Sequence, residues 1–348
     1  MADIVFYMFL IAQATTRMEW WEAVLLGVIE GLTEYLPVSS TGHLIVAQRL
    51  MGMASDDAAN AYAICIQAGA IVAVMGLYRH RIKQMIVGLI GRDANGRKLF
   101  INVCAAFVPA AVIGFAFDKQ IESILFGLWP IIIAWFIGGL VILAIGRAET
   151  AGTVKLAGTA PLESLHVRNA MFIGLAQCMA MWPGTSRSLV TIVAAWAVGL
   201  SITAAVEFSF LLGLITLGAA TCYQALKYGD VMVSEFGVSA LVIGFIAATI
   251  SAAIAVKWFV AFLTRSGLSL FGWYRVAIAM IVGSMVLAGT IGASTESDEQ
   301  FESNRQQKQY ERGNGIRTVN TTSPFAQTEV PTNAPPHHQS QRARDGAE

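Results

Sequence analysis

Charged residues are scarce in this chain, and their scarcity excludes an ordinary soluble domain. Only 13% of its 348 residues are Asp, Glu, Lys or Arg, whereas 55% are hydrophobic and the mean hydropathy is +0.60. A soluble globular domain carries about 25% charged residues. The composition therefore predicts a polytopic membrane protein embedded in a lipid bilayer. The formal net charge is +0, so there is no electrostatic case for a nucleic-acid partner.

Cysteine is rare as well, and its placement gives no metal-binding pattern. The four cysteines, Cys65, Cys104, Cys178 and Cys222, are scattered over apolar segments. We expect them to be buried, inert thiols. The apolar N-terminus lacks a basic region, so we expect no cleaved signal peptide. Residues 1–19 are instead interpreted as an N-terminal extension, either a short extra helix or a membrane-associated segment.

Long apolar segments dominate the rest of the chain. They run over Trp20–Leu36, Thr41–Met51, Ala61–Tyr78, Leu99–Phe117, Leu128–Ile145, Val167–Trp182, Ser186–Leu200, Ala204–Leu226, Gly237–Leu263 and Leu270–Ile291. A helix needs about 20 residues to span a bilayer, so five or six of these segments are long enough. Four shorter ones form two pairs, broken at Pro37 and at Pro183. Each pair predicts a re-entrant helical hairpin that turns inside the membrane and leaves on the side it entered.

The charges of the loops predict how the spans are oriented. The loop at 79–98 is rich in Arg and Lys and is placed in the cytoplasm, together with the loop at 147–168 and Arg265. The loop at 227–236 has no basic excess and is placed outside. Each hairpin is then followed by about three transmembrane helices, and the odd number of spans inverts the second half. The predicted fold is thus all-α, an inverted-topology repeat with halves at about 20–146 and 167–292.

The last part of the chain, residues 293–348, differs sharply in composition. It is rich in polar residues and charge and poor in large apolar residues, so we expect a disordered polar tail. The pair His337-His338 lies in this tail and is interpreted as part of a solvated segment.

Two carboxylates lie in the first hairpin, inside apolar surroundings. Glu30 and Glu34 are four residues apart and project from one face of a helix. Their repulsion in a low dielectric is relieved if one is protonated, if a cation lies between them, or if a divalent metal binds. The alternative is a solvated helix face, which the apolar neighbours disfavour. We expect Glu30 and Glu34 to be the metal ligands, because Mg²⁺ and Ca²⁺ prefer oxygen ligands.

Hydroxyls and a histidine follow the break at Pro37. Ser39, Ser40 and Thr41 can cap the next helix, and that structural role suffices for at least one of them. His43 lies one turn further along. A lone histidine on an apolar helix is more often a core residue, but this one shares the hairpin with two glutamates. Histidine suits proton transfer near neutral pH and can also attack phosphorus.

The second hairpin carries a motif suited to an anion. It reads Gln177…Pro183-Gly184-Thr185-Ser186-Arg187-Ser188 and opens a helix, whose free N–H groups attract anions. Arg187 adds a planar set of donors that matches phosphate oxygens. Arg187 can also neutralise Glu30 or Glu34, and the two roles are compatible. Two carboxylates, an imidazole, a guanidinium and several hydroxyls together favour a phosphate-bearing ligand.

These two motifs resemble those of the undecaprenyl-diphosphate phosphatases, bacterial membrane enzymes linked to bacitracin resistance. The resemblance covers about residues 20–292 and extends to Ile66-Gln67-Ala-Gly-Ala-Ile, Pro109-Ala-Ala-Val-Ile-Gly114, Glu207-Phe-Ser-Phe-Leu-Leu212 and Tyr274-Arg275. Glu163 is the candidate for an acidic residue that some members carry before the second hairpin. Leu189-Val190 depart from the family, which usually has Gly-Ala there, so packing at this hairpin, specificity or rate can differ.

The resemblance implies an activity and a location. It implies a hydrolase that removes the terminal phosphate of undecaprenyl diphosphate and so recycles the lipid carrier for peptidoglycan and envelope glycans. It implies dependence on a divalent cation, Mg²⁺ or Ca²⁺, and a site that opens to the outer face of the bacterial cytoplasmic membrane. A homodimer is left open.

The expected roles follow from the residue types. Arg187, Gly184, Thr185, Ser186, Ser188 and Gln177, with Ser39 and Thr41, would bind substrate, whereas Glu30, Glu34, Ser40, His43 and Arg187 would carry catalysis. Three attacking groups stay open: Ser40 with His43 as base, His43 itself, or water activated by His43 or a glutamate. The alternative function is a polyprenyl-phosphate flippase or transporter that uses the same residues. The histidine and the several hydroxyls favour the enzyme.

Overall fold

The structure is a computed structural model that describes residues 18–51, 53, 57–125, 127–150 and 158–291. These residues form helices and no β-strand, apart from one isolated bridge between Ala160 and Leu200. The all-helical architecture predicted from the sequence is therefore confirmed. The predictions for the N-terminal extension before Met18 and for the polar tail lie outside the described residues.

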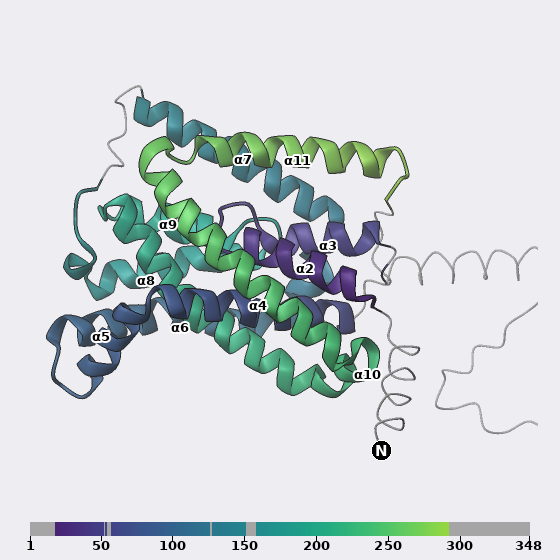
Figure 1. Cartoon of the computed structure of the whole chain (residues 1–348). Coiled ribbons are helices and arrows are strands. Elements are labelled where there is room, and N and C mark those ends of the chain that lie inside the picture. The colour runs from purple at the N-terminus through teal and green to yellow at the C-terminus, as the bar shows by residue number, and fades with distance from the viewer. Residues whose placement is uncertain (1–17, 52, 54–56, 126, 151–157, 292–348) are drawn as a thin grey trace, which may run out of the picture. The chain divides into compact units, whose positions relative to one another are not determined.

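The first part of the chain forms a pair of short helices and then longer ones (Figure 1). The elements are α2 (Trp20–Thr33), α3 (Ser40–Leu50), α4 (Asp57–Leu77), α5 (Arg79–Leu89), α6 (Ala94–Leu125) and α7 (Leu128–Thr150). The side chains of Glu19 and Glu22 form a capping box with the backbone at the start of α2. This box satisfies N–H groups that a helix start leaves without partners.

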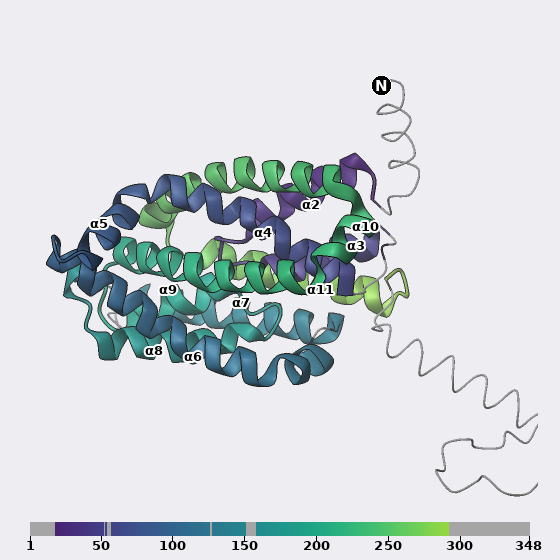
Figure 2. The same cartoon turned by 90° about the horizontal axis from the view of Figure 1, so that it is seen from below.

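The second part repeats that order of short and long helices (Figure 2). The elements are η1 (Leu162–Ser164), α8 (Val167–Gln177), η2 (Cys178–Met181), α9 (Arg187–Ala197), α10 (Ile202–Ser266) and α11 (Ser269–Leu287). The breaks at Pro37 and Pro183 both fall between short helices, as the sequence predicts.

Five of the described helices are long and apolar enough to cross a membrane. The matching ranges are Ala59–Leu77, Ala94–Phe117, Leu128–Ala148, Ile202–Ser266 and Ser269–Leu287. Their length and composition confirm the prediction of a polytopic membrane protein.

Two predicted loops are largely helical. Helix α5 occupies most of the 79–98 loop and ends before Gly91, whose φ is 80°. The predicted loop at 227–236 lies inside α10, which reverses direction only at Gly237, with φ 74° and ψ 156° (Figure 1). The error has a physical reason: the charges near Tyr228 mark the membrane boundary but do not break a helix. The chain turns at the first glycine beyond them, because only glycine readily adopts this conformation.

The cysteines are less buried than predicted. Cys65, Cys104 and Cys178 are half-buried and Cys222 is exposed, so the prediction of buried thiols is wrong for Cys222. Its helix, α10, is a membrane-spanning candidate, and the exposed surface of such a helix contacts lipid. A thiol behaves there as a small apolar group.

Glycines bring the helix of the two carboxylates against α10. A Cβ atom on Gly27 would lie 2.4 Å from the Gly244 carbonyl oxygen, and one on Gly31 would lie 2.1 Å from the Ser251 hydroxyl. No side chain fits at either point, so the two backbones approach closely. This contact fixes the position of α2, which carries Glu30 and Glu34.

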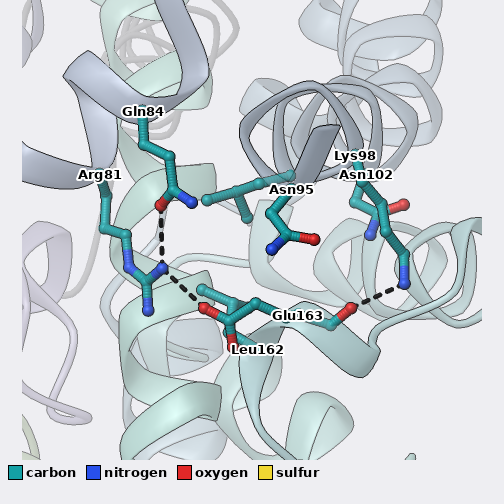
Figure 3. Close-up of a pocket in the computed structure, with 8 residues that line it drawn as sticks. Arg81, Gln84, Asn95, Lys98, Asn102, Leu162 and Glu163 are labelled. Carbon is teal, nitrogen blue, oxygen red and sulfur yellow. Dashed lines mark hydrogen bonds and ion pairs between the residues drawn. The ribbon is translucent and has the colours of Figure 1, made fainter. Parts of the chain in front are cut away.

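Polar contacts join the α4–α6 connection to the entry of the second hairpin (Figure 3). Arg81 pairs with Glu163 of η1 at 2.8 Å. Its Nε also pairs with Glu207 of α10, which is not drawn in Figure 3, at 2.8 Å. Lys98 donates to the Glu163 carbonyl oxygen at 2.7 Å. The pKa of the Glu163 carboxyl lies below its ordinary value because its own backbone N–H and then the Arg81 guanidinium bind the ionised form. The loops before α6 and before α8 therefore lie at the same end of the helices.

Candidate active site

The two polar breaks, residues 34–39 between α2 and α3 and residues 182–186 between η2 and α9, have the same unusual backbone conformation. Ser39 precedes α3 with φ 74°, and Ser186 precedes α9 with φ 73°. Among the described residues these are the two non-glycine positions with positive φ. Such positions cost energy and persist only where surrounding contacts hold them, which is common at functional sites. Ser186 also caps its helix, because its hydroxyl accepts the Leu189 N–H at 3.3 Å.

The carboxylate of Glu34 joins the two breaks. One of its oxygens accepts Arg187 Nη2 at 2.8 Å, and the other accepts the hydroxyl of Ser40. Both partners of the ion pair are nearly buried, with 10% of the Arg187 side chain and 5% of the Glu34 side chain exposed. A charged hydrogen bond in such surroundings is strong and directional.

Further contacts fix the Arg187 guanidinium. Its Nη1 donates to the Ser209 carbonyl oxygen at 3.0 Å, and the group lies 5.4 Å from the ring centre of Tyr35. A Cβ on Gly213 would come within 2.4 Å of Nη1, so glycine leaves the space that the guanidinium occupies. Arg187, the first residue of α9, is thus held by the residues just after α2 and by α10.

The other hydroxyls of the second break hold the first break in place. Ser188 donates to the Leu36 carbonyl oxygen at 2.9 Å, and Ser186 lies 3.0 Å from the Ser188 hydroxyl. Leu36 precedes the proline of the first break. These serines therefore supply a hydrogen-bond donor to the Leu36 carbonyl oxygen, which lies beyond the end of α2. Irregular backbone inside a membrane needs such partners.

Arg275 of α11 binds both breaks at once and was not predicted as a site residue. It is fully buried, and its Nη1 donates to the carbonyl oxygens of Pro37 and Thr185, both at 3.2 Å. Its Nη2 donates to those of Gly184 at 2.7 Å and Ala134 at 2.9 Å. The sequence held a signal, since a charge inside the apolar segment 270–291 is as costly as one in a hairpin.

Glu30 is the other buried carboxylate. It is 0% exposed, and neither of its oxygens meets ordinary hydrogen-bond geometry with a described residue, although the Glu34 carboxylate and the Ser40 hydroxyl both lie close enough to interact with it. Its charge interacts with those of Glu34 and Arg187, so it belongs to the same cluster. Two unpartnered oxygens of this kind fit a hard cation. Among the described residues, no group of three or more His, Cys, Asp or Glu side chains lies close enough together to hold a metal ion.

A cavity of about 200 Å³ opens between the two breaks. Eight predicted site residues line it: Glu34, Ser39, Ser40, Thr41, Gln177, Gly184, Ser186 and Arg187. Glu30, His43, Thr185 and Ser188 are not among its lining residues. Gln67 and Thr216, which were not predicted, are. Buried Gln177 accepts the Thr216 hydroxyl at 3.4 Å, whereas its Nε2 has no partner in the described structure. This amide leaves a donor available beside the cavity.

His43 points to a different set of partners. Its Nδ1 lies 2.6 Å from the Ser39 carbonyl oxygen and its Nε2 lies 2.7 Å from the Tyr274 hydroxyl. A carbonyl oxygen can only accept, so Nδ1 carries a proton and Nε2 of the neutral ring accepts from Tyr274. The hydroxyl of Ser40 is bonded to Glu34, and no bond joins it to His43 in the described residues. The structure thus places Ser40 beside a glutamate and not beside the histidine.

Comparison with known proteins gives one family. Residues 23–281 match the family described as Bacitracin resistance protein BacA. The chain is 42% identical to an undecaprenyl-diphosphatase of Sorangium cellulosum over 266 residues, which is 76% of this chain and 86% of that protein. It is 40% identical to an undecaprenyl-diphosphatase of Nitrosomonas europaea over 283 residues, 80% of this chain and 100% of that protein.

Proposed function

The chain belongs to the BacA family of bacitracin resistance proteins, and we propose that it hydrolyses undecaprenyl diphosphate to undecaprenyl phosphate and inorganic phosphate. This reaction recycles the lipid carrier for peptidoglycan and envelope glycans and would confer resistance to bacitracin. One observation carries the proposal beyond the family match: Ser40, Glu34 and Arg187 are bonded in series at the wall of one cavity.

The cavity suits a diphosphate attached to a lipid. Arg187 supplies a fixed positive charge, and the α9 N-terminus supplies N–H groups. The unpartnered amide of Gln177 gives a further donor for a phosphate oxygen. Apolar Ala110, Met181 and Leu217 complete the wall. The polyprenyl chain would stay in the bilayer while its headgroup enters between the two breaks.

Ser40 is the preferred nucleophile and Glu34 its base. The Ser40 hydroxyl already donates to Glu34, so the carboxylate can take that proton as the serine oxygen attacks the terminal phosphorus. The bridging P–O bond then breaks and undecaprenyl phosphate leaves with its electron pair. Arg187 balances the charge on the transferred phosphoryl group. Water next attacks the phosphoserine, Glu34 returns the proton to the serine oxygen, and phosphate is released. Direct attack by water assisted by Glu34 uses the same contacts.

His43 has a positioning role in this mechanism. Its hydrogen bond to the Ser39 carbonyl oxygen holds the strained residue next to Ser40. Action of His43 as the base or as the nucleophile would first require breaking its bonds to Ser39 and Tyr274.

Glu30 and Glu34 would hold the divalent cation, Mg²⁺ or Ca²⁺. The two unpartnered, buried oxygens of Glu30 support this assignment. When bound, the cation would neutralise phosphate charge and lower the pKa of an attacking group. Without it, Glu30 would be a buried carboxyl group next to the Glu34 carboxylate, an arrangement that costs free energy if both are ionised.

We also propose the inverted repeat and its orientation. Each polar break and its short helix are followed by three long apolar helical segments. These are α4, α6 and α7 after the first break, and the parts of α10 before and after Gly237, with α11, after the second. The equal backbone conformations of Ser39 and Ser186 support the correspondence of the two hairpins. The basic residues near α5 would lie in the cytoplasm, so that the cavity of the inner-membrane protein is reached from the periplasmic side.

The test is phosphate release from undecaprenyl diphosphate by purified protein in detergent. We expect release that a chelator abolishes and that Mg²⁺ or Ca²⁺ restores. Ser40→Ala and Glu34→Ala should each lower turnover by at least about 100-fold. Glu163→Gln is the matched control, because its carboxylate lies outside the cavity and its replacement should leave turnover near wild type. Absence of release by folded wild-type protein with both cations supplied would overturn the proposal.

A further inference from the structure

A second polar cleft lies between the starts of α6 and α8, away from the catalytic cavity. It has a volume of about 330 Å³ and shares no lining residue with that cavity. Helices α6 and α8 pack side by side (Figure 2). The cleft is lined on the α6 side by Arg97, Lys98 and Ile101, and on the α8 side by His166 and Val167.

The cleft is basic, and the nearby acids are already engaged. Among the described residues, no side chain forms a hydrogen bond or ion pair with the side chain of exposed Arg97 or with that of exposed His166. Lys98 donates only to a neutral carbonyl oxygen, that of Glu163, so its charge is not balanced (Figure 3). The Glu163 carboxylate is paired with Arg81, and Asp93 accepts the Gly96 N–H at 2.8 Å.

Apolar side chains adjoin these charges on the outer surface of the same helices. Ile101 is 49% exposed and Val167 is 43% exposed, and Met171, about one turn further along α8, is 47% exposed. Exposed apolar residues beyond a basic rim are typical of a helix that passes from the headgroup layer into hydrocarbon. The membrane-spanning candidate within α6 runs over Ala94–Phe117.

The α8 N-terminus adds a further attraction for anions. His166 is its N-cap, and its side chain accepts no hydrogen bond from the first turn. The first N–H groups of α8 therefore keep their partial positive charge next to His166 and Val167. A charged cleft, a helix start and lipid-facing apolar residues meet at one place.

We propose that this cleft binds the phosphodiester headgroup of an anionic phospholipid, whose acyl chains lie along Ile101, Val167 and Met171. Arg97 and His166 would contact the phosphate, since basic clefts between membrane helices suit such headgroups. The bound lipid would join the start of α6 to the start of α8, the first helix of the second hairpin. This site is separate from the proposed hydrolytic site and does not depend on it.

The test measures the melting temperature of purified full-length protein in detergent as phosphatidylglycerol or phosphatidylcholine is titrated in. Phosphatidylglycerol should raise the melting temperature with saturation, and phosphatidylcholine should not. In the double variant Arg97→Gln/His166→Gln the midpoint concentration should rise roughly tenfold. Lys98 is kept, because its bond to Glu163 holds the local fold.

Two controls show whether the response needs this cleft and a lipid headgroup. Arg265→Gln removes an exposed charge outside the cleft and should leave the titration unchanged. Inorganic phosphate at the same concentrations should give no comparable rise. An equal rise with phosphate would mean a free anion site, and an equal response to both lipids, or full retention of the response in the double variant, would also overturn the proposal. Phosphate release by the double variant should stay near wild type; its loss would contradict two separate sites.

Discussion

At the scale of single residues, the Glu34 carboxylate has two tasks that use different oxygens. One oxygen accepts a hydrogen bond from Arg187 and the other accepts one from the Ser40 hydroxyl. In the proposed mechanism, the phosphate oxygens of a diphosphate in the cavity would share the Arg187 donors with Glu34. The Glu34 oxygen that faces Ser40 would stay in place for the proton.

Arg275 is the residue on which the first prediction rests. Arg275→Met should lower the free energy of unfolding by about 2–5 kcal/mol, because carbonyl oxygens of both breaks lose their buried donor. Turnover should fall more steeply than substrate affinity, since small displacements of Ser40 and Arg187 reduce reactivity strongly. The measurements are thermal unfolding and separate values of kcat and KM.

Tyr274→Phe is the matched control for Arg275. It changes the preceding residue and removes one hydroxyl, which is bonded to His43 at 2.7 Å. Its effect on stability should be about 1 kcal/mol or less. Arg275→Lys keeps the charge but has fewer donors, and an intermediate turnover is expected. If folded Arg275→Met protein keeps a normal kcat, the hydrogen bonds from Arg275 to the backbone carbonyl oxygens are not needed to position Ser40 and Arg187.

Sequence reasoning found many of these residues because charges are rare in apolar segments. The same reasoning applied to Arg275 would have added it. It could not assign the partner of Ser40, since His43, three residues away, and Glu34, six residues away, are both close in sequence. Side-chain direction decides between them: His43 points to Tyr274 of α11, which is 231 residues away. Gln67 and Thr216 were missed because single polar residues in spanning helices are common and carry no pattern.

At the scale of elements, the prolines predicted the breaks between short helices, whereas the reversal in α10 was misplaced. Proline lacks a backbone N–H and disfavours a continuing helix, and polar residues follow both Pro37 and Pro183, so these two are strong signals. Proline alone is not sufficient, since Pro109 lies inside α6. Charges such as Lys227 and Glu235 only mark where a helix leaves the membrane, and helices can continue beyond that point. The turn depends on the backbone freedom of Gly237, which a hydropathy pattern does not detect.

Gly237 gives the second prediction. Gly237→Ala should destabilise the protein by about 1–3 kcal/mol, because φ 74° with ψ 156° is accessible mainly to glycine. Gly229→Ala is the matched control: its helical position has nothing within 4 Å of a new Cβ, and alanine should stabilise it slightly. Thermal unfolding of the two variants beside wild type tests this. Equal melting temperatures for both variants would show that the reversal at Gly237 does not require glycine.

At the scale of the whole molecule, the two halves pack along their helices, as α2 does on α10, and polar side chains join them at two separate places. One is the contact between the polar breaks, which Arg187 and Arg275 make away from the helix ends. The other is at the helix ends, where Arg81 binds Glu163 and Glu207. Loop charges predicted that the segments around 79–98 and 147–168 share a side, and the Arg81–Glu163 pair places them together. The partners themselves were not predictable, because exposed charges are numerous and interchangeable in sequence.

The pairing at the helix ends gives the third prediction, a dependence of stability on pH. The pKa of Glu163 is lowered from its ordinary 4.5, so the folded state holds the carboxylate ionised more strongly than the unfolded state does. Its contribution is therefore fully present above that ordinary value and is lost as pH falls through the lower, folded value. Because 38% of the Glu163 side chain is exposed, the contribution should be about 1 kcal/mol or less.

Glu163→Gln isolates this contribution from other acid effects. Wild type should melt roughly 1–4 °C above Glu163→Gln near pH 7, and the gap should close toward about pH 3. High salt should narrow the gap at neutral pH, since the pair is only partly buried. A gap that widened on acidification would mean that the neutral carboxyl is the favoured form in the folded protein. The Arg81 side chain would then contribute through packing and not through its charge. The two halves would be held together at this end by Lys98 and Asn102, which donate to the carbonyl oxygens of Glu163 and Leu165 just before α8.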